Sequence, residues 1–391
     1  MLLRKMFLVN IFYLAYISVN WFSDWAILRV SNLHLLPNFN DLRLVLASSD
    51  CAREYGFITF SANIARECTY NYGFSLVRIF HLFQINSSHA NFIGFTLLLV
   101  CLFSLIYLHL RLNPIGKLSY LAVILVLMSP ISSFLIERAN LDVLIFLSVL
   151  VGCWLLIRKN VKLALLVIFL GSLIKFYTLP LLLLALVFKS SLTNRIFGCL
   201  LFLVGTLVTI HDIRLIDGNF PRNCSASFGN PVLFVCFREV GVDIPFQIQN
   251  ILGLLLFAAI FLVIYFLNHG RNYDLKIHLA FNMRYQELDI LYLFTATTFL
   301  FCYFSSVNVD YRLIFLAYPA LKETITCTSR NYQYFFLFPT LILTFWFVDN
   351  SFFLQPIGDL ALAFWAGQVL FRILIKFEIL VPVQGTPHQT I

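Results

Sequence analysis

The sequence predicts an all-α, multi-pass membrane protein, and three observations lead to this prediction. Hydrophobic residues make up 60% of the 391 residues and charged residues only 12%, with a mean hydropathy of +0.87. Soluble proteins contain about 45–50% apolar and about 25% charged residues. Several apolar stretches approach the roughly 20 residues that cross a bilayer as a helix, and no polar helix faces cover them. We expect about 12 transmembrane helices, within a range of roughly 10 to 13.

The apolar stretches place the expected helices in order along the chain. The first, residues 6–22, follows two basic residues as a signal peptide would, but aromatic residues stand where a small-residue cleavage site would follow. We therefore expect it to be a retained helix. The polar segment 21–88 separates it from the remaining helices, which are expected over residues 90–110, 118–136, 141–157, 161–188 with a break near Lys175 to Pro180, 196–211, 247–268, 288–306, 312–321, 333–348 and 356–375.

Charge and composition predict the orientation and extent of the membrane domain. With the N-terminus in the cytoplasm, most basic residues of the short loops fall on the cytoplasmic side and most acidic residues on the other. We expect a protein of the cytoplasmic membrane with both termini inside and its working face outside. One domain, residues 1–380, precedes a disordered tail at 381–391. The net charge of +8 does not indicate nucleic acid binding, since the basic residues form no stripe or patch.

The segment 21–88 is expected to be a structured first extracytoplasmic loop. Asn38-Phe39-Asn40-Asp41 ahead of a leucine-rich stretch is typical of a capped helix start. Leu42, Leu44 and Leu46 are then available to a membrane surface, so we expect an interfacial helix.

The nine cysteines divide into those within apolar spans, expected to be small buried hydrophobic residues, and those in loops. Cys51 with Cys68, and Cys224 with Cys236, fall in loops expected outside, where two disulfides are possible. No Cys/His spacing fits a zinc site. No cofactor or metal is expected, although dependence on a divalent cation stays open because only the absence of a dense acidic triad argues against it.

Four polar clusters are candidates for chemistry because ionisable residues at span ends or within apolar sequence are costly and tend to be functional. Each also has a structural explanation: a turn at the interface, a lysine reaching the headgroups, a surface ion pair or a helix N-terminal charge. The clusters are Asp41-Leu42-Arg43 with Asp50, Glu137-Arg138-Ala139-Asn140-Leu141-Asp142, Lys175-Phe176-Tyr177, and Asp310-Tyr311-Arg312.

The expected topology brings all four clusters to the outer face, which combines a carboxylate with several cations. This combination suits transfer from a phosphate-linked donor. Arginine and lysine would hold the phosphate leaving group and stabilise its growing charge. A carboxylate within about 3 Å of an acceptor hydroxyl would remove its proton.

The order of motifs is similar to that of a known family. A first transmembrane helix is followed by FNDLR, CTYNYGFSLVRIF, ERANLDVLIFL, GSLIKFYTLPLLLL and DYRLIFLAYPAL. This order resembles the membrane-embedded glycosyltransferases of the GT-C superfold, in particular the bacterial family 87 group, over most of residues 1–375. The individual motifs are short, so the resemblance depends on their order and spacing.

The resemblance implies an inverting transfer, at the outer face, from a polyprenyl-phosphate-sugar donor to a glycan or glycolipid acceptor. It also implies an aspartate base in the first outer loop, which is Asp41 here, with Asp50 in reserve. Lys175 and Tyr177 match the family's Lys-x-Tyr element. The family's Asn-x-Asp element is matched by Asn140 and Asp142.

The remaining site residues follow from charge or from a partial match. Where the family carries Asn-Tyr-Pro, this chain has Asn71-Tyr72-Gly73, and Asn71 and Tyr72 are expected to contact sugar hydroxyls. Asp310 and Tyr311 are further candidates for substrate binding. Charge alone assigns the donor phosphate to Arg43, Arg138, Lys175 and Arg312.

Two other classes of function stay open. A transporter or flippase for a lipid-linked saccharide would show paired repeats and charges near the bilayer midplane; the sequence shows neither. A polysaccharide polymerase or ligase would carry its large catalytic loop late in the chain, whereas here the largest loop follows the first helix.

Overall fold

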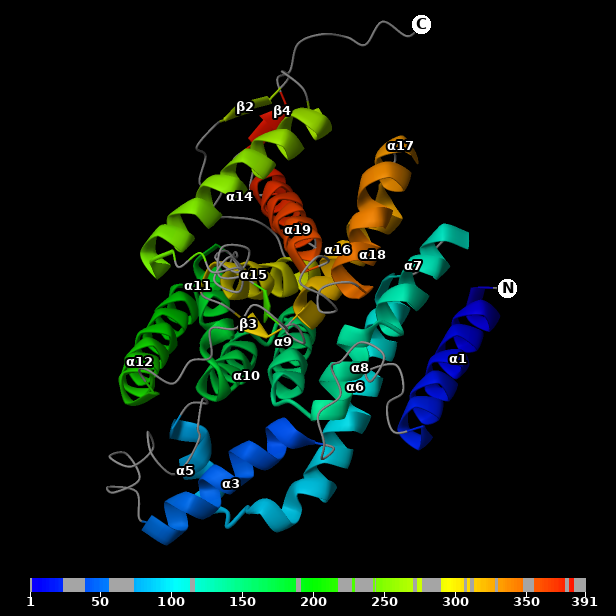
Figure 1. Ribbon diagram of the computed structural model, residues 1–391. Coiled ribbons are helices and arrows are strands. Elements are labelled where there is room, and N and C mark those ends of the chain that lie inside the picture. Colours follow the sequence, from blue (N-terminus) through cyan, green and yellow to red (C-terminus); the bar gives the residue numbers. More distant parts are fainter. Residues whose placement is uncertain are drawn as a thin grey trace, which may run out of the picture.

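In the computed structural model, the described part of the chain is almost entirely helical (Figure 1). Within the described part of the chain there are also four short strands, which pair two by two. Strand β1 (Ser227–Phe228) pairs antiparallel with β3 (Asn308–Val309), and β2 (Tyr273–Leu275) with β4 (Leu380–Pro382). The structure describes residues 2–23, 39–55, 74–112, 117–187, 191–216, 227–228, 242, 244–269, 273–275, 290–305, 308–309, 313–327, 330–346, 355–376 and 380–382.

The predicted apolar spans are helices, with ends that differ from the predicted ones by a few residues. In chain order they are α1 (Leu2–Phe22), α6 (Ala90–Leu112), α7 (Lys117–Leu127), α8 (Pro130–Arg138), α9 (Asp142–Ile157), α10 (Val161–Ile174), α11 (Leu179–Val187), α12 (Leu192–Ile216), α14 (Phe246–His269), α15 (Ile290–Ser305), α16 (Ile314–Thr326), α17 (Arg330–Tyr332), a π-helix η5 (Gln333–Leu337), α18 (Phe338–Trp346) and α19 (Gln355–Lys376).

Two interruptions occur within the predicted spans. The break in 161–188 is confirmed: α10 ends at Ile174, Lys175 is extended, and a 3₁₀ turn η2 (Phe176–Thr178) leads into α11. The predicted span 118–136 is divided into α7 and α8. Ser129 adopts an extended conformation and caps α8 through Ser132, because a residue before proline avoids the helical region.

Among the described residues, five helices are long and apolar enough to cross a membrane. Two of them carry large apolar side chains that the rest of the described protein leaves mostly uncovered. Within Leu192–Asp212 of α12 only 11% of the window is buried, and within Gln247–Phe266 of α14 only 22%. Exposed apolar surface of this extent, on helices of this length, is consistent with a helical membrane protein. The count of about 12 spans stays a prediction.

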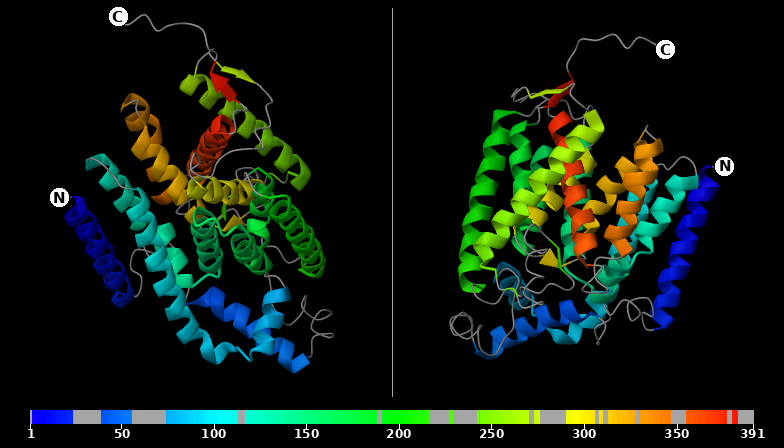
Figure 2. Two further views of the ribbon diagram at one scale, coloured as in Figure 1. Left: turned by 180° about the vertical axis from the view of Figure 1, so that it is seen from behind. Right: turned by 45° about the horizontal axis from the view of Figure 1, so that its top comes forward.

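The predicted helix in the first polar loop is present as α3 (Asn40–Tyr55). It lies across one end of the helical bundle, away from the ends of the chain (Figures 1 and 2). It packs against α6 and α8 and against a second short helix, α5 (Phe74–Leu82), which was not predicted from the sequence.

The predicted membrane-facing leucines of α3 need a correction. Leu42 and Leu46 are fully buried in a core cluster, and only Leu44 is exposed. Residues i and i+4 share one face of a helix, whereas i+2 lies on the other side, so an alternating pattern cannot form one membrane-facing stripe.

The first two residues of the predicted tail, Val381 and Pro382, belong to a strand. They lie in strand β4, paired with Asp274 and Tyr273 of β2. The remainder of the tail, residues 383–391, lies outside the described residues.

Candidate functional site

Helix α3 begins where it meets the turn between α8 and α9. The backbone N–H of Phe39 donates to the carbonyl oxygen of Glu137 at 2.9 Å. The Phe39 ring packs 5.7 Å from that of Trp21 at the end of α1. It also covers Gly94 of α6 so closely that a Cβ atom there would overlap the ring. These contacts place the first turn of α3, and therefore Asp41, over the α8–α9 turn.

The α8–α9 turn is a buried polar hexapeptide, Glu137 to Asp142. Ala139 ends α8 in the left-handed conformation, with a φ of 44°. The side-chain oxygen of Asn140 accepts from the backbone N–H of Asp142 at 2.9 Å, which is the local bonding typical of an Asx turn. This bond orients the Asn140 amide so that its nitrogen faces α3.

The carboxylate of Asp41 is bound by two side chains of this turn. Arg138 forms an ion pair with Oδ1, and Asn140 Nδ2 donates to Oδ2 at 2.5 Å. Asp41 is 7% exposed and Arg138 8%. A charge this deeply buried is stable only when it is paired and hydrogen-bonded, so each residue depends on the other.

Lys175 joins the same network from the break between α10 and η2. Its Nζ lies 2.8 Å from Asp142 Oδ1 and donates to Asn140 Oδ1 at 3.2 Å. Nζ also lies 6.0 Å from the centroid of the Tyr177 ring. Asn140 is therefore the link between the two ion pairs, and we call Asp41, Arg138, Asn140, Asp142 and Lys175 the polar cluster.

The charges of the polar cluster are balanced, which differs from the surplus of cations expected from the sequence. Arg138 and Lys175 are matched by Asp41 and Asp142. Capacity for an anion remains on Arg138, whose Nε and Nη1 are buried with no hydrogen-bond partner in the described structure. The guanidinium group can thus bind Asp41 and a further acceptor together, because it presents five N–H donors in a fixed fork.

Two predicted residues on α3 lie away from the polar cluster. Arg43 donates to Asn91 Oδ1 at 2.6 Å. Asp50 Oδ2 accepts from the backbone N–H of Ser87 at 3.1 Å and from its hydroxyl at 2.5 Å. Nine residues after Asp41, Asp50 lies about 13.5 Å along the helix and half a turn around it. The structure therefore separates Asp50 from Asp41 and pairs Arg43 with Asn91, and their predicted roles stay predictions.

Five of the predicted site residues lie outside the described residues: Asn71, Tyr72, Asp310, Tyr311 and Arg312. Their assignments stay predictions. Conversely, Phe39 and Gly94, which position α3, carry no local sequence signal because their importance depends on a contact between distant segments. In the described part of the chain, no group of three or more His, Cys, Asp or Glu residues is arranged to hold a metal.

Cys51, on α3, is disulfide-bonded. The five other cysteines within the described residues are free. Cys68, the predicted partner of Cys51, lies outside the described residues. The loop pairing Cys224–Cys236 also falls outside the described residues.

Comparison of the chain with protein-family models, with curated proteins and with solved structures found no match.

Proposed function

We propose that the protein is a membrane glycosyltransferase that moves a sugar from a polyprenyl-phosphate donor to an acceptor hydroxyl at the extracytoplasmic face. The observation that carries this proposal is the ion pair between Asp41 and Arg138. It joins a carboxylate on a helix across the end of the bundle to a guanidinium group with unused donors. A lipid-linked donor keeps its tail in the bilayer and its phosphate at the membrane surface. A general base and a cation that binds the phosphate are therefore required together at the surface end of the bundle.

The geometry supports a single displacement. Each carboxylate oxygen can accept two hydrogen bonds, so Asp41 can bind an acceptor hydroxyl while Asn140 still holds it. The hydroxyl proton passes to Asp41, the acceptor oxygen bonds to the anomeric carbon, and the bond from that carbon to the phosphate oxygen breaks. The leaving group is polyprenyl phosphate, and attack from the opposite side inverts the anomeric centre.

Arg138 has two roles in this scheme. Before the donor arrives, it neutralises Asp41. When the phosphate binds, the free Nε and Nη1 atoms donate to it and stabilise the charge that develops as the sugar leaves. Lys175 is a positioning residue in this scheme, because its ammonium group binds Asn140 and Asp142 and not the substrate.

The disulfide at Cys51 supports the outer orientation of α3. Disulfides persist in oxidising compartments and are rare in the cytosol. The basic residues of the opposite loops give the same orientation through the positive-inside rule.

The position of the charges favours a transferase over a transporter. Arg138 and Asp142 lie at helix ends, and Asp41 lies in the first turn of α3. Transporters instead place their charged sites near the bilayer midplane, whereas Lys175, although it lies at the break after α10, binds the same helix-end residues Asn140 and Asp142. A polymerase or ligase stays an alternative that the acceptor specificity would decide.

The test compares Asp41→Asn with Asp50→Asn, an aspartate in the same helix outside the polar cluster. Both proteins are purified in detergent and supplied with polyprenyl-phosphate sugars of different head groups and a mixture of glycan acceptors. We expect Asp41→Asn to lose transfer and Asp50→Asn to retain it. Transfer at the wild-type rate by Asp41→Asn would exclude Asp41 as the base.

A further inference from the structure

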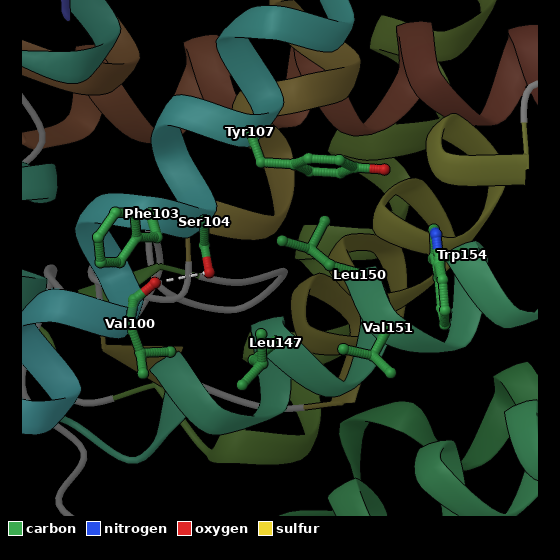
Figure 3. Close-up of a pocket in the computed structure, with 8 residues that line it drawn as sticks. All are labelled: Val100, Phe103, Ser104, Tyr107, Leu147, Leu150, Val151 and Trp154. Carbon is green, nitrogen blue, oxygen red and sulfur yellow. Dashed lines mark hydrogen bonds between the residues drawn. The ribbon is translucent and has the colours of Figure 1, made fainter.

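A groove lies between α6 and α9. It is lined by the later residues of both helices, away from the polar cluster at the start of α9. It has a volume of about 320 Å³, within the roughly 300–1,000 Å³ typical of small-molecule sites. Its eight lining residues include one hydroxyl, one phenol and one indole (Figure 3). They are Val100, Phe103, Ser104, Tyr107, Leu147, Leu150, Val151 and Trp154.

The body of the groove is apolar. The Ser104 hydroxyl donates to the Val100 carbonyl oxygen of its own helix at 2.7 Å, so it does not need a ligand. Phe103, at the rim, is 68% exposed, and the helices on which the groove lies are apolar. The lining between Val100 and Val151 is therefore suited to hydrocarbon rather than to a sugar or a peptide.

The two aromatic residues with polar atoms lie together at one end. Tyr107 is the last lining residue along α6 and Trp154 the last along α9, and the close-up draws Tyr107 at the top and Trp154 at the right of the groove (Figure 3). Tyrosine and tryptophan are enriched where hydrocarbon meets the headgroups. The aromatic end of the groove therefore marks its headgroup end.

Cations continue from this aromatic end. The guanidinium carbon of Arg158 lies 5.8 Å from the centroid of the Trp154 ring. Lys159 and Lys162 follow in the turn and at the start of α10, and all three side chains are exposed. No ion pair joins any of the three to a carboxylate within the described structure. Unbalanced positive charge thus meets the end of an apolar groove.

We propose that this groove binds a bilayer phospholipid with an anionic headgroup, whose acyl chain fills the groove and whose phosphate binds Arg158. Lys159 and Lys162 supply further positive charge to the headgroup. Basic pockets between membrane helices bind anionic headgroups in this manner. The occupant is amphipathic, since the apolar groove and the unpaired cations are continuous.

This lipid site lies at the opposite end of α9 from the polar cluster. The 16 residues of α9 extend about 24 Å at 1.5 Å per residue, close to the roughly 30 Å of a hydrocarbon core. Asp142 begins the helix and Arg158 follows its last residue. The lipid therefore belongs to the leaflet away from Asp41, and the site does not depend on the proposed glycosyl transfer.

The test is native mass spectrometry of delipidated protein titrated with phosphatidylglycerol or with phosphatidylcholine of the same acyl chains. We expect one phosphatidylglycerol molecule to be retained at least tenfold more strongly than phosphatidylcholine. Arg158→Gln removes the guanidinium group that binds the lipid phosphate, and Val151→Phe fills part of the groove with a larger side chain. Each is expected to lower retention of the anionic lipid about tenfold, with charge selectivity lost only in Arg158→Gln.

Matched substitutions elsewhere serve as controls. Arg195→Gln removes a cation near the start of α12, which packs on α10 and α11, and Val204→Phe alters an exposed valine of the same helix. Both are expected to bind as the wild type does. Equal retention of the two phospholipids, or unchanged binding by both groove variants, would overturn the proposal. The proposal would also be overturned if polyprenyl phosphate competed with phosphatidylglycerol for this groove and was retained more strongly.

Discussion

Asp41 and Arg138 come from segments separated by 97 residues, yet each is the main partner of the other. Water is largely excluded from both side chains, so loss of one partner leaves a charge without compensation. Asn140 differs because it is neutral and links Asp41 to Lys175 through its two amide atoms. The polar cluster is thus stabilised both by an ion pair and by hydrogen bonds of a neutral amide. Substitutions of Arg138 and of Asn140 can measure the two contributions separately.

Replacement of Arg138 by methionine is expected to destabilise the fold by about 3–5 kcal/mol, the cost of leaving one member of a buried ion pair alone. Unfolding by increasing SDS in mixed micelles would measure it. In the double variant Arg138→Met with Asp41→Asn, the loss of unfolding free energy should be clearly smaller than the sum of the losses in the two single variants. Additive losses would show that the two side chains do not interact in the membrane.

Asn140→Ala should cost less than Arg138→Met, about 1–3 kcal/mol, because it removes hydrogen bonds from buried groups but no charge. The same SDS titration ranks the two variants. A greater loss for Asn140→Ala than for Arg138→Met would mean that the amide, rather than the ion pair, holds α3 in place.

Helix α3 illustrates what the sequence predicts well and what it does not. Its existence followed from a capping pattern, and its charge cluster was expected to meet those near Arg138 and Lys175. The actual bonds were not predictable, since Asp50 binds Ser87, 37 residues away, rather than sharing the role of Asp41. Helix α5 and the buried faces of Leu42 and Leu46 were also missed, because a hydropathy pattern does not reveal the surface on which a short helix packs.

The contact between α3 and α6 depends on Gly94. Gly94→Ala would place a Cβ atom less than 3.0 Å from the nearest atom of the Phe39 ring, so the ring must shift, and we expect the start of α3 to shift with it. We expect a loss of about 1–3 kcal/mol, as for other overpacked cores, with reduced sugar transfer because Asp41 moves with the helix. Thermal denaturation in detergent and the transfer assay would measure both effects.

Leu99→Ala is the control, in the same helix but at a side chain that is 40% exposed. It should change both properties little. Equal behaviour of the two variants would contradict a role for the close packing of Phe39 on Gly94.

The arrangement of the helices gives the protein two chemically different ends. One carries α3 and the polar cluster, and the other carries the exposed cations after α9. The apolar spans and most helix ends were readable from the sequence because a bilayer imposes length and hydropathy on every crossing. The proposed substrate depends on residues such as Asp310 and Arg312, outside the described residues, and on chemistry that helix positions alone do not determine.

This arrangement predicts opposite labelling of the two ends. A membrane-impermeant maleimide applied to intact cells should label Ser88→Cys, which is exposed beside α3, above the level of the parent protein. Lys159→Cys should be labelled only after the cells are opened. The reverse pattern would invert the proposed topology and place the polar cluster in the cytoplasm.

The most direct measurement is the rate of sugar transfer from a polyprenyl-phosphate sugar in proteoliposomes that hold either the wild type or Asp41→Asn. Loss of a general base typically lowers a rate by about 10²–10⁴-fold. We expect a loss of this size for Asp41→Asn, while the wild type releases polyprenyl phosphate and forms a product of inverted anomeric configuration. Absence of transfer by the wild type across a panel of such donors, or a retained configuration in its product, would contradict the proposed function.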